Sequence, residues 1–298
     1  MRRSVTLPEP YDFTLTLGLL QRSYRDPTTR RPSAAEIHRA SRTPEGPAAI
    51  SIARDGGRAR TQAWGPGAAW LLDRLPALLG LDDDPSAFAP EHPLLRELHR
   101  RMRGLRFGRT GLVMEAVIPS VIEQKVTGPE AFTSFARLVR RYGEPAPGPL
   151  GLMLQPSPEV IAGLPYWALH AMGIERKRAE TLLRACAAAT RLKEAGAMAP
   201  ADASRRLRAL RGIGAWTAAE VARVALGDPD AVSVGDYHLK NVVAYALAGE
   251  PRGTDERMLE LLEPYRGHRG RAVRLIEAGG PMPPRFGPRA RLRSIARI

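Results

Sequence analysis

The sequence predicts an α+β protein in which a small antiparallel sheet precedes a larger, mostly α-helical part. Three observations support this fold class. Residues 49–64 read as a β-hairpin, because two runs of strand-forming residues flank an Asp-Gly-Gly turn at 55–57. From about His92 onward, the chain reads instead as helices joined by turns that contain Gly and Pro. The acidic, Pro-containing segment 81–86 breaks the pattern between the two parts.

The first part contains two more expected elements. Residues 11–17 alternate apolar and polar side chains, which is typical of a half-buried strand. Residues 68–79 have the spacing of an amphipathic helix, with a kink expected at Pro76. We therefore expect an N-terminal α/β domain over residues 1–88 and a helical domain over 89–298, which a chain of 298 residues is long enough to build.

The second part is expected to consist of helices separated by loops. Residues 129–143 begin with Pro at a favoured first position and end with Gly at a favoured C-cap, so they predict a helix. The five prolines within 144–158 indicate a loop, and another helix is expected over about 175–190. Two helices meet in a hairpin at about 203–226. The Pro- and Arg-rich tail, 281–298, is expected to be an extended basic strap.

Composition excludes several classes of protein. The single cysteine, Cys186, excludes a disulfide scaffold, a Cys-rich zinc site and a Cys-ligated iron–sulfur cluster. The six histidines lack the spacings of a catalytic zinc motif, so no catalytic metal is expected. No apolar run approaches the roughly 18 residues of a membrane span, and polar residues interrupt the N-terminus where a signal peptide would be apolar. We expect a soluble, cytoplasmic protein without a membrane partner.

The charge balance favours a polyanionic partner. The chain has 45 Lys+Arg against 31 Asp+Glu, a formal net charge of +14, and all but four of the basic residues are arginine. Codon bias of a GC-rich genome explains arginine over lysine but not the excess over acids. On charge alone, nucleic acid binding and simple solubility both remain open.

The hairpin carries the most informative motif. Gly212 and Gly214 lie two residues apart between two predicted helices, where glycine permits unusual backbone conformations and close approach of a ligand. The backbone N–H groups of the turn and of the next helix, through Ala215 and Thr217, form a site for a phosphate, which binds DNA without reading its sequence. Ile213 is expected to anchor the turn in the core. Taken alone, the motif also fits an ordinary corner between helices.

The segment that follows strengthens the DNA interpretation. The run Leu-x-Gly-Ile-Gly-x-x-Thr-Ala from Leu210 and the aspartate about twenty residues later, Asp236, resemble the helix-hairpin-helix DNA glycosylase superfamily (HhH-GPD). The resemblance implies a half-saddle-like α/β domain followed by a helical domain, with the active site in a cleft between two helical lobes. It implies that Asp236 is the catalytic residue. An aspartate there also suits a helix N-cap, and both roles are compatible.

Trp216 indicates which branch of the superfamily this chain resembles. Bifunctional members carry a lysine at that position, whose amine attacks the sugar and permits strand cleavage. Together with the missing cysteine cluster and the opening Pro-Tyr-Asp-Phe at 10–13, Trp216 makes the chain similar to the monofunctional 3-methyladenine DNA glycosylase II type. This resemblance implies an enzyme of base excision repair that flips out alkylated purines and hydrolyses the N-glycosidic bond. A catalytically silent DNA-damage-binding protein and a purely structural helical protein are the alternatives.

Residues 121–127 resemble the family's segment at a helix end. By position, Gln124 is expected to face the opened DNA stack. The next residue in the family is an apolar wedge that fills the gap left by the flipped base, whereas this chain has Lys125. The methylene groups of Lys125, the side chain of Val126 or another loop would then fill the gap.

Four residues are candidates for the base pocket. Trp216 is a candidate wall, with simple core packing as the alternative. Glu220 and Glu277 stand where the family has aromatic side chains, so they either attract a cationic base or point to solvent. Tyr237 is a candidate for a place near the sugar, or for the surface.

The resemblance also implies partners. The family hairpin often holds a structural Na⁺ or K⁺ through backbone carbonyls, which by position are those of Arg208, Leu210 and Ile213. No other cofactor is expected. The expected partner is double-stranded DNA containing damaged bases, bound by a monomer.

Overall fold

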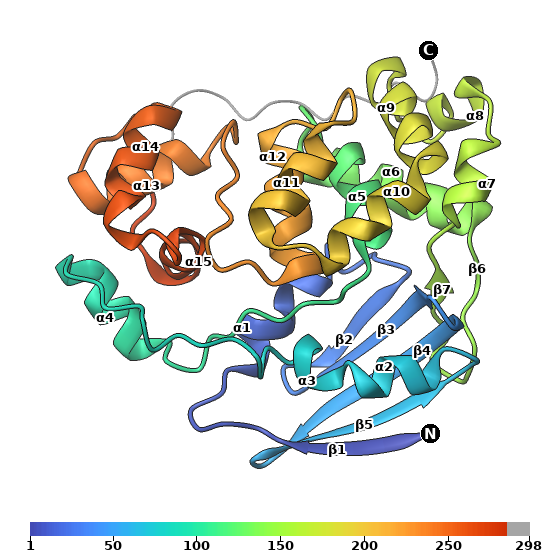
Figure 1. Ribbon diagram of the computed structural model, residues 1–298, viewed down its shortest axis with the longest axis horizontal. Helices are drawn as coiled ribbons and strands as arrows, with labels where there is room; N and C mark the ends of the chain where they lie inside the picture. Colours follow the sequence, from blue (N-terminus) through green and yellow to red (C-terminus); the bar gives the residue numbers. More distant parts are fainter. Residues whose placement is uncertain (285–298) are drawn as a thin grey trace.

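The computed structural model describes residues 1–284, so all but the first four residues of the predicted strap over 281–298 lie outside the described residues. Its N-terminal part is a five-stranded antiparallel sheet with the strand order β1-β5-β4-β3-β2 (Figure 1). The predicted hairpin is confirmed, with Asp55 paired to Arg58 next to the turn. The strands are β1 (Arg2–Thr6), β2 (Thr29–Ser33), β3 (Glu36–Thr43), β4 (Gly46–Asp55) and β5 (Arg58–Trp64).

The expected strand at 11–17 is wrong, because this segment forms the helix α1 (Phe13–Leu17). Asp12 caps it, accepting a hydrogen bond from the backbone N–H of Leu15 at 2.8 Å. Phe13, Thr16 and Leu17 are buried, and this spacing of three and four residues is helical. Over so few residues, it cannot be told from the alternation of a strand. The short η1 (Gly18–Leu20) follows.

The expected helix over 68–79 is interrupted. It divides into α2 (Ala68–Asp73) and α3 (Leu75–Leu78). Pro76 lies in the first turn of α3, where backbone N–H groups form no hydrogen bond within the helix, so proline costs none there. The helix α2 packs against β4 and β5 and covers one side of the sheet core.

The remainder of the described chain is mostly helical, which confirms the predicted fold class. The helix at 129–143 is confirmed as α6, with a capping box formed by Thr127 and Glu130. The expected loop 144–158 contains two paired two-residue strands, whose backbone lies beside β3. The elements are α4 (Pro93–Arg101), α5 (Val113–Ile122), α6 (Gly128–Tyr142), β6 (Glu144–Pro145), β7 (Met153–Leu154), α7 (Pro158–Ala162), α8 (Tyr166–His170), α9 (Arg176–Ala187), α10 (Ala189–Lys193), η2 (Glu194–Ala197), α11 (Pro200–Arg208), α12 (Ala215–Val221), η3 (Ala222–Leu226), α13 (Leu239–Ala248), α14 (Asp255–Leu262), η4 (Glu263–Tyr265) and α15 (Arg269–Gly279).

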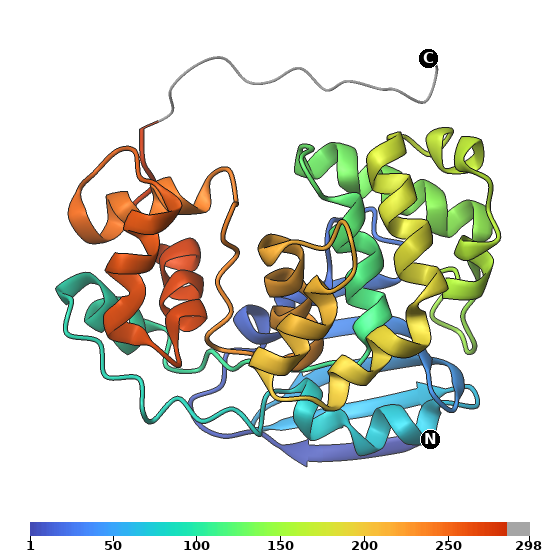
Figure 2. The same ribbon diagram turned by 45° about the horizontal axis from the view of Figure 1, so that its top comes forward.

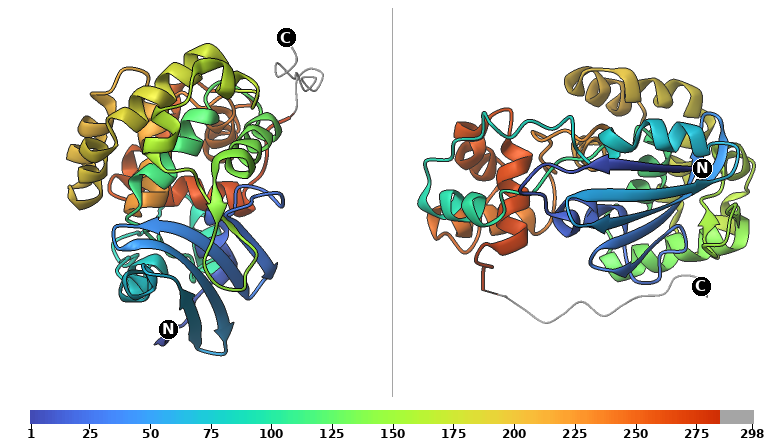
Figure 3. Two further views of the ribbon diagram at one scale, coloured as in Figure 1. Left: turned by 90° about the vertical axis from the view of Figure 1, so that its right-hand side faces the viewer. Right: turned by 90° about the horizontal axis from the view of Figure 1, so that it is seen from below.

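These helices form two lobes with separate hydrophobic cores. The hairpin lobe is built on α5–α12 and η3, and the C-terminal lobe on α4 and α13–α15. Figure 2 shows the two lobes side by side, and Figure 3 shows the sheet as a layer beneath them. Phe88 packs into the C-terminal lobe against His99 and Tyr265.

Two buried ion pairs join the sheet region to the lobes. Arg39 on β3 contacts Glu115 on α5 at 2.9 Å, and Asp83 contacts Arg271 on α15 at 2.5 Å. Each pair fixes one lobe to the N-terminal region, so the two lobes have a defined relative position. Within residues 1–284, no helix is long and apolar enough to cross a membrane.

Candidate active site

The turn between α11 and α12 holds its two glycines for different reasons. Gly212 has φ +101°, and a Cβ there would lie 2.3 Å from Thr181 Oγ1, so only glycine fits. Gly214 has φ −93°, which any residue adopts, so the expectation of a glycine-only conformation there is wrong. A Cβ at Gly214 would meet no protein atom within 4 Å among the described residues. Its exposed position is therefore available to an approaching backbone.

Buried side chains fix this turn from beneath. Ile213 is 4% exposed and belongs to the core of the hairpin lobe, as predicted. Gln124 donates through Nε2 to the carbonyl of Gly212 at 2.9 Å and to Thr217 Oγ1 at 2.8 Å. Thr217 is 2% exposed, so its side chain positions the turn from beneath. Its backbone N–H, in the first turn of α12, remains next to the partly exposed Ala215.

Asp236 is held by three N–H groups on the segment that joins η3 to α13. Its Oδ1 accepts from the backbone N–H of His238 at 2.8 Å and of Leu239 at 2.9 Å, so Asp236 closes the turn that leads into α13, whereas the N-cap of that helix is His238. Its Oδ2 accepts from Trp216 Nε1 at 3.1 Å. Asp236 remains partly exposed. The carboxylate is thus fixed between α12 of the hairpin lobe and the start of α13 in the C-terminal lobe.

A charged cluster lies next to Asp236. The π-helical turn η3 carries Arg223, whose Nη1 donates to Glu220 Oε1 at 2.9 Å and whose Nη2 lies 3.4 Å from Glu277 Oε2. Ser233 also donates to Glu220. Neither Glu220 nor Glu277 therefore simply points to solvent. We refer to Glu220, Arg223 and Glu277 as the charged cluster.

Burial and neighbouring charges shift the pKa values in this region. Burial raises the pKa of Glu277, although Arg223 and Arg274 oppose the shift. Burial alone would lower the pKa of Arg223, but Glu220 and Glu277 raise it above its ordinary value. The negative charge of Asp236 acts on both Arg223 and Glu277, which places the charged cluster within electrostatic reach of the candidate catalytic acid.

Glu123 forms a further buried ion pair at the end of α5. It pairs with Arg22, and the two side chains are 16% and 17% exposed. Burial raises the pKa of Glu123, whereas Arg22 lowers it and Glu220 raises it further.

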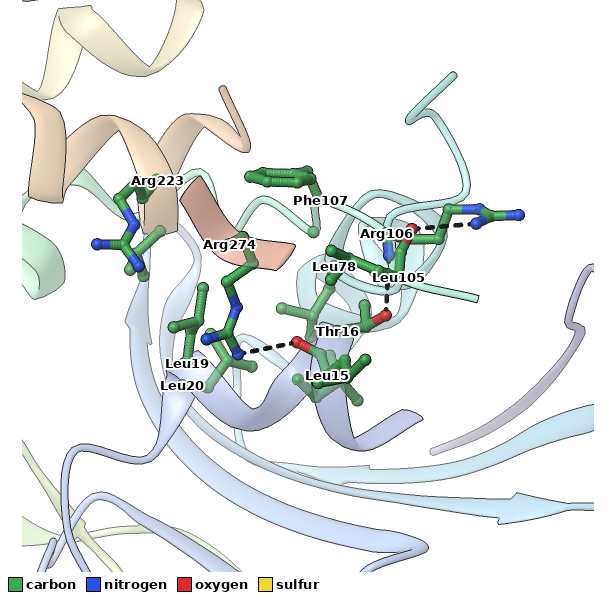
Figure 4. Close-up of a pocket in the computed structure, with 13 residues that line it drawn as sticks. Leu15, Thr16, Leu19, Leu20, Leu78, Leu105, Arg106, Phe107, Arg223 and Arg274 are labelled. Carbon is green, nitrogen blue, oxygen red and sulfur yellow. Dashed lines mark hydrogen bonds between the residues drawn. The ribbon is translucent and has the colours of Figure 1, made fainter. Parts of the chain in front are cut away.

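A small hollow, with a volume of about 20 Å³, lies between the two lobes and the N-terminal helix region (Figure 4). Arg223 on η3 and Arg274 on α15 reach it from the two lobes, and Phe107 contributes an aromatic wall. Apolar side chains of α1 and η1, including Leu19 and Leu20, line the opposite side. The hollow is partly apolar, and Arg223 is the member of the charged cluster that lines it.

Two of the residues that the sequence predicted for the site lie at the surface. Lys125 is exposed and has φ +55°, the only positive φ of a non-glycine residue within 1–284. Tyr237 is 79% exposed, with its ring edge-on to His238 at 4.8 Å between centroids, so it is no wall of the cavity.

The sequence interpretation missed Arg22, Glu123, Arg223, Ser233 and Arg274. A local signal existed for two of them, because Arg223 is three residues after Glu220 and Arg274 three residues before Glu277 on helices. For the other three, only the tertiary fold brings the side chains to the site.

Comparisons with known proteins place this chain in a family. The model of the HhH-GPD superfamily of base excision DNA repair proteins matches residues 118–266. A Mycobacterium tuberculosis relative, "Probable bifunctional transcriptional activator/DNA repair enzyme AlkA", is 32% identical over 171 residues, covering 55% of this chain and 34% of the relative. The Bacillus subtilis "Putative DNA-3-methyladenine glycosylase YfjP" is 29% identical over 160 residues, covering 51% of this chain and 55% of the relative. The chain thus spans about a third to a half of these relatives.

A solved structure supports the fold over nearly the whole chain. The 3-methyladenine DNA-glycosylase from Archaeoglobus fulgidus superposes with a TM-score of 0.76 and 20% identity, covering 92% of this chain and 97% of the other. Its similarity shows the common architecture of sheet and helical lobes. Because the superfamily match spans half of this chain and includes the hairpin and Asp236, the chain belongs to the HhH-GPD superfamily of base excision DNA repair proteins.

Proposed function

We propose that this protein is a monofunctional DNA glycosylase that removes alkylated purines from double-stranded DNA and leaves an abasic site. One observation carries the proposal: the carboxylate of Asp236 is fixed by three N–H groups between the two lobes, beside an exposed Gly-x-Gly turn. The names of the two relatives with similar sequences support DNA repair as the function. The Bacillus subtilis relative is named as a putative DNA-3-methyladenine glycosylase, which supports alkylated purines as the substrate class.

The arrangement suits hydrolysis of an N-glycosidic bond. The nucleotide must leave the base stack, at a cost of a few kcal/mol, before the bond is accessible. Departure of the base leaves positive charge on the sugar, which the fixed carboxylate of Asp236 stabilises while it orients a water molecule. An alkylated, cationic base is already a good leaving group. Trp216 occupies the family's lysine position, so no amine is available there to attack the sugar.

Base release without strand cleavage tests this proposal. Incubation of the protein with a methylated DNA duplex is expected to release free methylated purine, measured by mass spectrometry, and to leave the strand intact until alkali is added. Sodium borohydride should trap no covalent protein–DNA adduct, because no Schiff base forms. Cleavage without alkali, together with a trapped adduct, would contradict the monofunctional mechanism.

The alternative of a catalytically silent binder has one structural argument in its favour. Glu220 and Glu277, which replace aromatic residues expected from the family resemblance, are paired with Arg223 instead of forming a stacking surface. The same assay distinguishes the two functions: a silent binder would retain methylated DNA without releasing any base.

Gly214→Ala is expected to weaken DNA binding without weakening the fold. The new Cβ meets no protein atom and requires no positive φ, but it would block close approach of a phosphate to the turn. We expect a loss of about tenfold in affinity at constant salt, measured by fluorescence anisotropy, and an unchanged unfolding midpoint. Gly212→Ala is the contrasting variant, because φ +101° and the clash with Thr181 predict clear destabilisation. Unaltered affinity of Gly214→Ala would remove the turn from the DNA interface.

We also propose a structural Na⁺ or K⁺ at the hairpin, held by the carbonyls of Arg208, Leu210 and Ile213. Backbone oxygens are hard donors that suit such ions. The carbonyl of Leu210 already accepts the N–H of Ile213 at 3.0 Å, but a carbonyl oxygen has a second lone pair. The ion would stiffen the turn and takes no part in the chemistry.

A further inference from the structure

Arginines without acidic partners cover the exposed face of α6. Arg140 and Arg141 follow Arg137 by four residues or fewer, so the three exposed side chains share one face of the helix. Arg25 joins them from the loop before β2, because its carbonyl accepts a hydrogen bond from Arg140 Nη2 at 3.2 Å. None of these arginines forms an ion pair within residues 1–284. They therefore place several uncompensated positive charges on one surface.

The acidic residues near these arginines in the sequence have other partners. Asp26 is buried and closes its own loop by accepting the backbone N–H of Arg22 at 3.2 Å. Glu130 forms the capping box at the start of α6. Glu144 lies 3.0 Å from Arg42 in an ion pair. The arginine face of α6 therefore keeps its positive charge, which favours a polyanionic partner.

A rigid turn places an aromatic side chain beside the arginines. The backbone N–H of Asp26 donates to the carbonyl of Ser23 at 3.1 Å and closes the turn over residues 23–26. Tyr24 in this turn is 83% exposed, and the guanidinium of Arg25 lies 5.1 Å from the centroid of its ring. Exposed aromatic and arginine side chains are enriched at binding interfaces. We refer to the following residues as the α6 patch: Tyr24, Arg25, Arg137, Arg140 and Arg141.

The α6 patch is connected to the segment that is expected to face DNA. The helix α6 begins at Gly128, three residues after Lys125, and lies beside α5 in the hairpin lobe (Figure 1). The buried ion pair of Arg22 and Glu123 fixes the loop before β2 to the end of α5. At 1.5 Å per residue, Arg137 lies roughly 14 Å along the helix from its start. This length corresponds to about four base pairs of a duplex.

We propose that the α6 patch binds backbone phosphates of the duplex on one side of the damaged base. The guanidinium groups donate hydrogen bonds to phosphate oxygens, which positions the duplex without reading its sequence. The ring of Tyr24 covers a neighbouring sugar. The site takes its partner, double-stranded DNA, from the proposed function and adds a second contact outside the Gly-x-Gly turn. Only one of the two arms that flank the lesion reaches it.

Two asymmetric duplexes test this site. Each contains a tetrahydrofuran abasic analogue, and the arms measure about ten base pairs, one helical turn, on one side and about three on the other. The long arm is on the 5′ side of the analogue in the first duplex and on the 3′ side in the second. Fluorescence anisotropy at several salt concentrations measures the affinity for each duplex.

A triple variant with Arg137→Gln, Arg140→Gln and Arg141→Gln is expected to weaken binding of one duplex by about ten- to thirtyfold. For that duplex, the slope of log affinity against log salt should become shallower by about two to three, because up to three phosphate contacts are lost. The affinity for the other duplex should change less than about twofold. Arg25→Gln should show the same asymmetry with a smaller loss, so the test does not depend on the triple variant alone.

The matched control removes three arginines elsewhere: Arg96→Gln, Arg101→Gln and Arg103→Gln. These side chains are also exposed and form no ion pair within residues 1–284, but they lie on α4 and just after it, at the opposite end of the molecule (Figure 1). The control loses the same charge, so it measures the general attraction of a basic protein for DNA. It should change both affinities less than about twofold. Thermal unfolding checks that each variant is folded.

Equal losses for the two duplexes, or losses no larger than those of the control, would overturn the α6 patch and leave the glycosylase function intact. Release of methylated bases is measured separately on the wild-type protein. If that protein binds with the expected asymmetry but releases no base, the proposed enzymatic function fails and the α6 patch stands as a DNA contact.

Discussion

Asp236→Asn is expected to lower the rate of base release by about 10²–10³-fold while DNA binding is retained. The asparagine oxygen can still accept the N–H groups of His238 and Leu239, so the turn that leads into α13 survives. The variant loses the negative charge that stabilises the cationic sugar, and its amide nitrogen cannot accept from Trp216 Nε1. Single-turnover release of methylated base and the Kd for the same duplex measure the two effects separately.

Asp73→Asn is the control for this substitution. Asp73 is an 85% exposed carboxylate at the end of α2, in the N-terminal part of the chain. Its substitution should alter neither the rate of base release nor the Kd for DNA. Base release by Asp236→Asn at the wild-type rate would show that another group stabilises the sugar. Loss of DNA binding along with activity would instead indicate that Asp236 is mainly structural.

Arg271→Met is expected to reduce the free energy of unfolding by about 3–5 kcal/mol. Arg271 is 1% exposed, contacts Asp83 at 2.5 Å and lies 4.8 Å from the centroid of the Phe107 ring. Asp83 also accepts the backbone N–H of Phe107 at 3.0 Å. Removal of the arginine leaves the carboxylate buried without its charged partner, which is the large cost. Urea unfolding followed by circular dichroism measures it.

The double variant Arg271→Met/Asp83→Leu separates the charge effect from lost packing. If the single variant suffers from an uncompensated carboxylate, the double variant should be more stable than Arg271→Met alone. Arg266→Met provides the surface control, because Arg266 is 68% exposed and its loss should change the free energy of unfolding by no more than about 0.5 kcal/mol. A change of similar size in Arg271→Met would show that the pair contributes little to joining the C-terminal lobe to the N-terminal region.

Local sequence signals predicted those elements whose cause is local. The Asp-Gly-Gly turn determines the hairpin between β4 and β5, and the Pro and Gly at the ends of α6 determine its bounds. The same approach failed at 11–17, because so short an alternation cannot distinguish a strand from a capped helical turn. The position of Thr217 in the motif also does not reveal that its hydroxyl accepts a hydrogen bond from Gln124.

The sequence by itself determined the predicted α+β class, the Gly-x-Gly turn, the aspartate about twenty residues later and the tryptophan in place of lysine. These are properties of residue type and spacing, so they can be read from one chain. Only the tertiary structure decided that Trp216 donates to Asp236, and that Arg223 pairs with both Glu220 and Glu277. The contact between Arg223 and Glu277 joins the two lobes, and the contact between Trp216 and Asp236 joins α12 to the segment that leads into α13. Their energies depend on burial and on which partner packs opposite, and no spacing along the chain records either.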